Sequence, residues 1–253
     1  RDSYQSLYLK AYFPLEFMVG VINNFGGFYK TWLYVHEAKM SGGVIHPPHA
    51  NYSELLTRLY GIDLFLGLIH IKGLEKHWME TIPAERLQNG EYRSLFDFVN
   101  RLKIPLEQLT ILIQVGALRF TDQTKKDMLR QAPLLYAPQR KEQMGLPQLF
   151  ATPNKQFTLP GAADSPVEDA FDELNLLGFP VSLGMFDLLH PQYQKPSIVA
   201  QEQLQFVGKQ VQIVGQLVTY KTIRTRKGLP MVFGTLIDRE GNFFDTTHFP
   251  DSL

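Results

Sequence analysis

The spacing of apolar residues changes three times along the chain. Up to about residue 135 it follows the period of helices, interrupted by short extended pieces. Residues 136–163 are rich in Pro, Gln and Gly, a composition typical of linkers. A helical segment follows, and from Val207 onward the pattern is that of strands. The chain is therefore predicted to have a mixed fold, mainly α followed by β, with domains at 1–135, 136–206 and 207–253.

Several helix ends can be read directly from the residues. Ser94 and Asp97 predict the start of a helix over SLFDFVNRL, because the serine hydroxyl can satisfy a free backbone N–H. Pro105 at a first helical position and Gly116 after the last turn predict a helix over LEQLTILIQV.

The clearest helix start comprises Ser165, Pro166 and Glu168, and Gly178 should end this helix. One face is apolar and the back is acidic, so we expect the helix to pack on a neighbour, and we assign it no chemistry. The apolar stripe comprises Val167, Phe171, Leu174 and Leu177, and the acidic back comprises Glu168, Asp169, Asp172 and Glu173.

Three β-rich runs lie near the end of the sequence: VQIVGQLVT, MVFGTLID and FFDTTHF. The second and third are joined by a tight turn, DREGN, in which Gly241 can adopt a positive φ angle. A longer basic connection, YKTIRTRKGLP, joins the first and second. This order predicts the opening of an OB-type barrel. Two strands of such a barrel would be missing after Leu253, so we expect an open sheet edge and a truncated chain.

The segment LGLIHIKGLEKHWMETI has the form of a helix-hairpin-helix. In that motif a glycine, here Gly73, allows the backbone to approach a phosphate, and the next helix offers its free N–H groups to the same anion. Lys72 would add a positive charge, and such contacts are independent of DNA sequence. The alternative is an ordinary corner between helices, with Gly73 as a cap.

A second hairpin of this kind is predicted at LTILIQVGALRFTDQTKKDML. Gly116 again ends an apolar helix, and three cations follow: Arg119, Lys125 and Lys126. Two hairpins in tandem can track one duplex backbone. The alternative is that Lys125 and Lys126 lie on a solvated helix face, as most lysines do.

The basic connection between the first two strands is the best-defined cationic patch. Positive loops beside aromatic strands hold single-stranded nucleic acid through backbone attraction and base stacking. The alternative is a charged loop that maintains solubility, with strand phenylalanines in the core. The patch comprises Tyr220, Lys221, Arg224, Arg226 and Lys227, with Phe233, Phe243 and Phe244 in or near the adjacent strands.

Composition excludes several classes of site. The 253 residues contain no cysteine, which excludes disulfides and thiolate metal ligands and fits a reduced, cytoplasmic setting. His46 and His49 lack further ligands close by, so we expect no metal there. No phosphate-binding glycine loop and no nucleophile motif are present, so we predict no catalytic site. The net charge is zero, so any DNA binding must come from local basic patches.

Taken in order, the segments resemble the alpha subunit of bacterial DNA polymerase III, the replicative C-family polymerase. SYQSLYLKAYFPLEFMVGVINN is similar to the end of its fingers region, and GGVIHPPHANYSE to the following loop with paired prolines and an Asn-x-Ser. GLIHIKGLE, SLFDFVNRL and LIQVGALRF resemble its tandem helix-hairpin-helix region. LNLLGFPVSLGMFDLLHPQY and the strands up to Leu253 resemble the approach to its OB domain and that domain's first part.

The resemblance implies a carboxy-terminal portion of the polymerase, running from the end of the fingers through part of the OB domain. The palm carboxylates and their Mg²⁺ ions would lie upstream, so this portion should not catalyse nucleotidyl transfer even though the parent would be a DNA-directed DNA polymerase. The hairpins around Gly73 and Gly116 would hold duplex DNA behind the active site. Tyr220 to Lys227 would face the single-stranded template.

The resemblance also implies a clamp-binding peptide of the Gln-x-x-Leu/Met-Phe kind between the hairpins and the barrel. The matching stretch is LPQLF, which keeps Leu149 and Phe150 as hydrophobic anchors but has Leu146 where the family has glutamine. The anchors could still fill a pocket on a sliding clamp, or they could dock on their own domain.

We therefore hypothesise a cytoplasmic DNA-binding part of a replicative polymerase without chemistry of its own. The alternative is a scaffold that binds replisome partners such as the sliding clamp, which the zero net charge favours. Salt dependence would separate the two, because phosphate contacts release counterions on binding.

Overall fold

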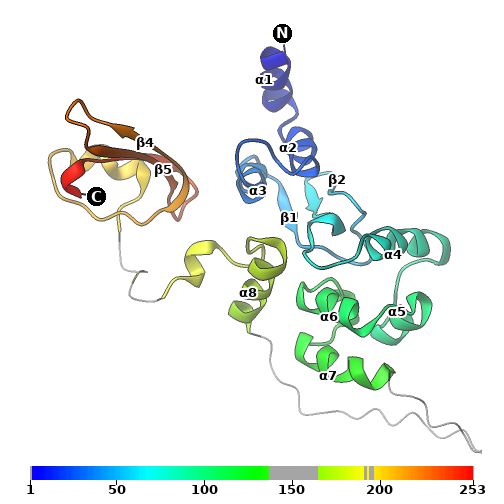
Figure 1. The fold of residues 1–253 in the computed structure, drawn as a ribbon. Coiled ribbons are helices and arrows are strands. Elements are labelled where there is room, and N and C mark those ends of the chain that lie inside the picture. Colours follow the sequence, from blue (N-terminus) through cyan, green and yellow to red (C-terminus); the bar gives the residue numbers. More distant parts are fainter. Residues whose placement is uncertain (1, 137–164, 191–192, 194–196, 253) are drawn as a thin grey trace, which may run out of the picture. The chain divides into compact units, whose positions relative to one another are not determined.

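The computed structural model describes residues 2–136, 165–190, 193 and 197–252 (Figure 1). The predicted mixed fold, mainly α and then β, is observed. Its α-helices in the described part are α1 (Asp2–Tyr12), α2 (Pro14–Asn23), α3 (Thr31–Met40), α4 (Lys76–Asn89), α5 (Leu95–Leu102), α6 (Leu106–Gln114), α7 (Lys125–Tyr136) and α8 (Pro166–Leu177). None of these helices combines the length and the apolar character that crossing a bilayer requires.

The described strands form two sheets of three strands each. The first sheet has the order β1-β3-β2, with β1 at Val44–His46, β2 at Arg58–Tyr60 and β3 at Asp63–Phe65. The second has the order β4-β5-β6, with β4 at Gln216–Arg224, β5 at Pro230–Ile237 and β6 at Phe243–His248. Short 3-10 turns are η1 (Leu68–His70), η2 (Arg119–Thr121), η3 (Met185–Leu188), η5 (Ala200–Phe206) and η6 (Pro250–Ser252).

The chain divides into two compact units. One, which we call the hairpin unit, comprises His46–Arg58 and Phe65–Ser182. The other, the helix–strand unit, comprises Arg1–Ile45, Leu59–Leu64 and Leu183–Leu253. The three predicted sequence domains stay predictions.

The helix–strand unit contains an antiparallel meander of the three long strands. The turn between β5 and β6 is the predicted DREGN: Asp238 Oδ1 accepts hydrogen bonds from the backbone N–H groups of Glu240 and Asn242, both at 2.9 Å. Gly241 has φ +89°, as the turn requires. Within the described residues the strands form an open sheet and no closed barrel, in keeping with the predicted partial barrel.

The core of the hairpin unit is built around α6, which packs on α7 and α8. The predicted cap of α5 forms, because the Asp97 N–H donates to Ser94 Oγ at 3.1 Å. Pro105 caps α6 from the position before its first residue, one residue earlier than predicted. Apolar side chains from several elements are excluded from solvent here; they include Leu68, Ile82, Phe98, Ile104, Leu109, Leu112 and Ile113.

Helix α8 has the predicted bounds but not the expected orientation. Gly178 ends it in the left-handed conformation, with φ +90°. Val167 and Phe171, expected in the packed stripe, are 44% and 47% exposed, whereas Ala170, Glu173 and Leu177 are buried. The expected stripe was therefore wrong for its first half. The physical reason is the neighbouring surface, which is cationic and receives the acidic side of the helix.

The buried position of Leu109 leads to a stability prediction. Leu109→Ala should lower the free energy of unfolding by about 2–5 kcal/mol, because a cavity replaces buried methyl groups on α6. Leu87→Ala, at an almost fully exposed site on α4, should change it by less than about 0.5 kcal/mol. Urea denaturation of both variants measures the difference, and equal effects would contradict the assigned core.

Candidate nucleic-acid interface

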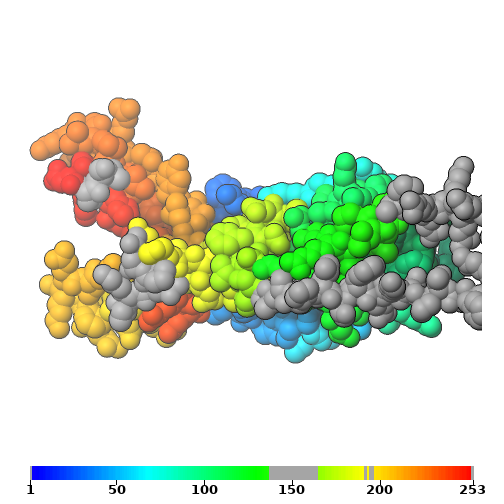
Figure 2. All heavy atoms as spheres, turned by 90° about the horizontal axis from the view of Figure 1, so that it is seen from below, coloured from blue at the N-terminus to red at the C-terminus, as the bar shows by residue number. Residues whose placement is uncertain are grey.

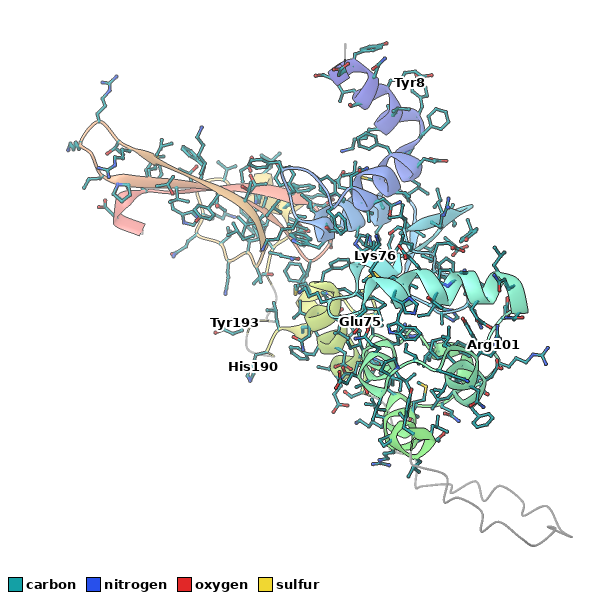
Figure 3. All side chains as sticks on the ribbon, turned by 45° about the vertical axis from the view of Figure 1, so that its right-hand side comes forward. Tyr8, Glu75, Lys76, Arg101, His190 and Tyr193 are labelled. Atoms are coloured by element: carbon teal, nitrogen blue, oxygen red, sulfur yellow. The ribbon has the colours of Figure 1, made fainter. Side chains whose placement is uncertain are left out.

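The first hairpin lies between η1 and α4, at the predicted Lys72 and Gly73. Gly73 has φ +80°, a conformation that favours glycine. Gln108 on α6 holds both sides of this turn: its Nε2 donates to the Gly73 carbonyl at 3.1 Å, and its Oε1 accepts from the Glu75 N–H at 2.9 Å. Glu75 and Lys76 mark the start of α4 in Figure 3. These two hydrogen bonds fix the first hairpin turn to α6, the helix that leads into the second hairpin.

The second hairpin follows α6 at Gly116, which has φ +75°. The Ala117 N–H donates to the Leu112 carbonyl at 2.9 Å, and the Ala117 carbonyl accepts from the Ala50 N–H at 2.8 Å. Arg119 folds back onto the turn, with Nη1 donating to the Gly116 carbonyl at 2.9 Å. A Cβ at Gly116 would lie 2.5 Å from Arg119 Cζ, so the guanidinium occupies the space that a side chain would need.

Three of the four cations predicted to contact duplex DNA are paired with carboxylates of α8. Lys125 Nζ lies 2.8 Å from Asp169 Oδ1, and Lys126 Nζ lies 2.7 Å from Glu168 Oε2. Arg119 Nη2 lies 3.3 Å from Glu173 Oε1. In Figure 2 the yellow-green atoms of α8 lie against the green atoms of the second hairpin.

Lys72 also contacts α8, through its backbone. Its N–H donates to the Leu176 carbonyl, in the last turn of α8, at 2.8 Å. The Lys72 side chain is exposed, and its Nζ would lie 3.6 Å from a Cβ at Gly178. One helix therefore contacts both hairpins.

Two carboxylates of α8 differ in their surroundings. Glu173 is fully buried, and its Oε2 accepts from the N–H groups of Val181 and Ser182 at 2.7 and 2.8 Å and from Ser182 Oγ at 2.9 Å. Asp172 lies 3.6 Å from Lys125 Nζ. Burial raises the pKa of Asp172, and the neighbouring Lys125 charge only partly opposes this effect.

A polar framework supports the hairpins, and the pattern of the sequence did not predict it. Arg101 on α5, which is labelled in Figure 3, pairs with both oxygens of Glu85 on α4, at 2.7 Å each. The same guanidinium lies 4.3 Å from the centre of the Tyr92 ring. Burial alone would raise the pKa of Glu85, but hydrogen bonds, chiefly from Arg101, lower it. The partners are far apart in sequence, so no local motif signals them.

Asn51 belongs to this framework as well. Its Nδ2 donates to the Tyr92 carbonyl and its Oδ1 accepts from the Tyr92 N–H, both at 2.9 Å. The Asn-x-Ser noted in the sequence contains this residue together with Ser53, whose Oγ donates to the Leu66 carbonyl at 2.8 Å. The sequence contained the Asn-x-Ser motif, but no neighbouring residue indicated that Asn51 would bind Tyr92.

The predicted single-strand contacts lie on both faces of the second sheet. Lys221 pairs with Phe233 across β4 and β5, so these two side chains share a face. Tyr220 and Arg224 lie on the opposite face, where Tyr220 stands across from Gly234. Tyr220 is 64% and Phe233 40% exposed.

The rest of the basic patch follows the strands. Arg226 and Lys227 are exposed in the turn after β4. Phe243 is exposed, whereas Phe244 is buried. The patch therefore offers one cationic turn and two separate aromatic surfaces.

The remaining predicted positions are those of the clamp-binding peptide and the two histidines. Leu146, Leu149 and Phe150 lie outside the described residues. His46 stacks on Phe65, with ring centres 4.4 Å apart, and His49 Nδ1 accepts from the Asn51 N–H at 3.1 Å. In the part of the chain that the structure describes, no three potential ligands gather as a metal site would require.

Comparison with known proteins gives the class of the hairpin unit first. Residues 42–128 match the family described as the helix-hairpin-helix motif, and this range contains both hairpins. The chain thus carries a helix-hairpin-helix region, as predicted, and the match ends before α8 begins.

Relatives of the whole chain give the particular resemblance. In an alignment of 258 positions that covers 93% of the chain, the chain is 29% identical to DNA polymerase III subunit alpha of Staphylococcus aureus (strain MRSA252). In an alignment of 274 positions that covers 99% of the chain, it is 28% identical to DNA polymerase III subunit alpha of Staphylococcus epidermidis (strain ATCC 35984). The matches take in 22% and 24% of these relatives, so the chain spans less than a quarter of their length. The predicted resemblance to bacterial DNA polymerase III alpha subunits is confirmed.

The hairpin unit should be sensitive to acid through His70, which precedes the first hairpin. Burial lowers the pKa of His70 from 6.5 to about 4. Thr57 Oγ1 accepts from the Gly67 N–H and lies 3.1 Å from His70 Nε2, so its hydroxyl proton can be donated to a neutral imidazole. In the unfolded chain His70 is protonated near its ordinary pKa of 6.5, whereas in the folded chain it is protonated only near pH 4. The stability that is present above pH 6.5 is therefore lost as the pH falls toward 4.

We expect the unfolding free energy of the parent chain to fall by about 1–3 kcal/mol between pH 7.5 and 5 through this residue. His70→Gln should reduce that dependence, and His248→Gln, at an exposed position on β6, should leave it unchanged. Urea denaturation at the two pH values measures this. An identical pH dependence in the parent and in His70→Gln would contradict the role of His70.

Proposed function

We propose that this chain is a DNA-binding part of a bacterial replicative DNA polymerase, holding duplex and single-stranded template without catalysing. The observation that carries the proposal is the pair of fixed glycine hairpins in a chain similar along 93–99% of its length to DNA polymerase III alpha subunits. Helix-hairpin-helix turns present backbone N–H groups and a helix N-terminus, which together suit phosphate. The proposal includes a cytoplasmic location, and it assigns any Mg²⁺-dependent chemistry to residues outside this chain.

The proposed duplex contacts are sequence-independent. Lys72 and Gly73 would serve one phosphate and Gly116 another, with Arg119, Lys125 and Lys126 as neighbouring charges. Gln108 supports this function because it fixes the distance between the two turns. The phosphates of a duplex repeat at regular spacing. Two turns held at a fixed separation should therefore bind it with higher affinity than two turns that move independently.

The proposed single-strand contacts use the β4–β5 hairpin. Arg226 and Lys227 would attract the backbone at the turn, while exposed Tyr220 and Phe233 offer rings on which bases can stack. Lys221, on the same face as Phe233, places a charge beside one of these rings.

A second function, a scaffold that binds replisome partners such as the sliding clamp, is favoured by one observation. Three of the proposed duplex cations are already paired with carboxylates, and the net charge of the chain is zero. Under this alternative the anchors Leu149 and Phe150 would bind the clamp, and DNA contact would be minor.

Fluorescence anisotropy with labelled single-stranded DNA over a salt series tests the single-strand contacts. Neutralising Lys221, Arg224, Arg226 and Lys227 together, each to Gln, should weaken binding at low salt by about tenfold or more. The slope of log affinity against log salt should become shallower by about 2 to 3, since each lost phosphate contact removes about 0.7.

A matched variant controls for charge. It neutralises four exposed cations elsewhere and changes the net charge equally: Lys30, Lys39, Arg58 and Arg93, each to Gln. Equal loss in both variants would mean that only overall charge matters and would reject the assigned patch. If the unmodified chain binds no DNA at low salt but binds the sliding clamp in the same assay, the scaffold function is favoured.

A further inference from the structure

Helix α8 faces the two hairpins with its acidic side. Glu168, Asp169 and Glu173 pair with hairpin cations, while Val167 and Phe171 face solvent. An amphipathic helix held by the hydrophobic effect alone would show the reverse orientation. Ala170 and Leu177 add a limited apolar contact, so charge and hydrogen bonds make up much of what holds the helix.

The groups that α8 occupies are those that the hairpins would offer to a phosphate. Three are the side chains of Arg119, Lys125 and Lys126. The fourth is the Lys72 N–H in the first hairpin, which donates to the Leu176 carbonyl. Carboxylates and the carbonyl end of a helix both carry negative charge, as phosphates do. Helix α8 thus presents to the hairpins the same chemistry as a nucleic-acid backbone.

Displacement of α8 would expose the buried Ala170 and Leu177, but parts of the contact cost little to break. The Lys126 and Glu168 side chains are 37% and 61% exposed, and an ion pair this close to solvent contributes little. Burial raises the pKa of Asp172, which lies 3.6 Å from Lys125, so release of α8 would return solvent to a carboxylate whose charge burial disfavours.

Glu173 supports the same conclusion. Three of its hydrogen bonds come from Val181 and Ser182, just beyond α8, and only the bond from Arg119 crosses to the hairpins. A segment from α8 to Ser182 can therefore separate as one piece while the buried carboxylate keeps most of its partners.

We propose that α8 is an internal competitor that occupies the phosphate-binding side of both hairpins, and that duplex DNA binds there when it displaces α8. This inference rests on the proposed duplex function. Because the helix belongs to the same chain, its effective concentration at the hairpins is high and independent of protein concentration. The match to the helix-hairpin-helix family ends at residue 128, so α8 is an addition to the motif rather than a part of it.

The first test weakens the competitor. Glu168→Gln combined with Asp169→Asn removes the Lys126–Glu168 pair and the shorter of the two Lys125 pairs, and it leaves the Asp172 contact and the Glu173 turn in place. The matched control combines Glu16→Gln and Glu107→Gln, which also removes two acids from the first turns of helices and changes the net charge equally. Duplex DNA should bind the α8 variant about tenfold more tightly than the control variant, measured by anisotropy in the same salt series.

A third variant assigns the gain to the released cations. Adding Lys125→Gln to the α8 variant should remove most of the gain in duplex affinity, whereas Lys125→Gln in the parent should change duplex affinity less. If Lys125→Gln has the same effect in both backgrounds, the gain does not come from release of this lysine and the proposal is overturned.

The second test uses the unmodified chain and does not depend on how the variants fold. Hydrogen exchange is followed in the peptide that covers Pro166–Leu177, with and without a saturating DNA duplex. Faster exchange of this helix in the presence of duplex is the expected result. Duplex binding that leaves α8 equally protected, with an α8 variant no tighter than its control, would overturn the competition while preserving duplex binding. Failure of every chain to bind duplex at low salt would overturn the duplex function itself and the competition with it.

Discussion

The side-chain amide of Gln108 is the interaction on which the arrangement of the two hairpins depends. It sits on α6, the helix that leads into the second hairpin, and it binds the backbone on both sides of the first. The residue is buried, and its donor and acceptor are both used, so removal of the side chain would leave backbone groups unsatisfied as well as free the turn. Two turns that would otherwise be separate corners thereby become one rigid surface.

Much of the helical structure followed from local rules. Ser94, Gly116 and Gly178 stop or start helices through backbone groups only a few residues away, and these positions were predictable. The orientation of α8 was not predictable in this way. Apolar periodicity indicates the face of a helix that an apolar neighbouring surface would bury. The surface next to α8 instead presents Arg119, Lys125 and Lys126. Which face packs is decided by the partner surface, and that surface is assembled from residues distant in sequence.

The candidate site shows the same limit in the strands. Tyr220 and Lys221 are adjacent in sequence and read as one cationic, aromatic patch, yet the pleat sends them to opposite faces of the sheet. Only the register with β5, which contains an irregularity between Leu217 and Thr219, shows that Phe233 joins Lys221 rather than Tyr220. Sequence clustering therefore could not divide the predicted patch into its two surfaces. The framework of Asn51, Tyr92 and Arg101 escaped prediction because each partner is meaningful only in the folded chain.

The position of Arg119 links the chemistry of one residue to that of another far along the chain. Its guanidinium fills the space that a side chain at residue 116 would take, and it also brings the cation that faces the fully buried Glu173. A residue larger than glycine at 116 would be strained at φ +75° and would require a shift of the Arg119 guanidinium, the group that faces Glu173. Residues 116, 119 and 173 are therefore coupled, so the effect of a substitution at one of them on stability should depend on the residues at the other two.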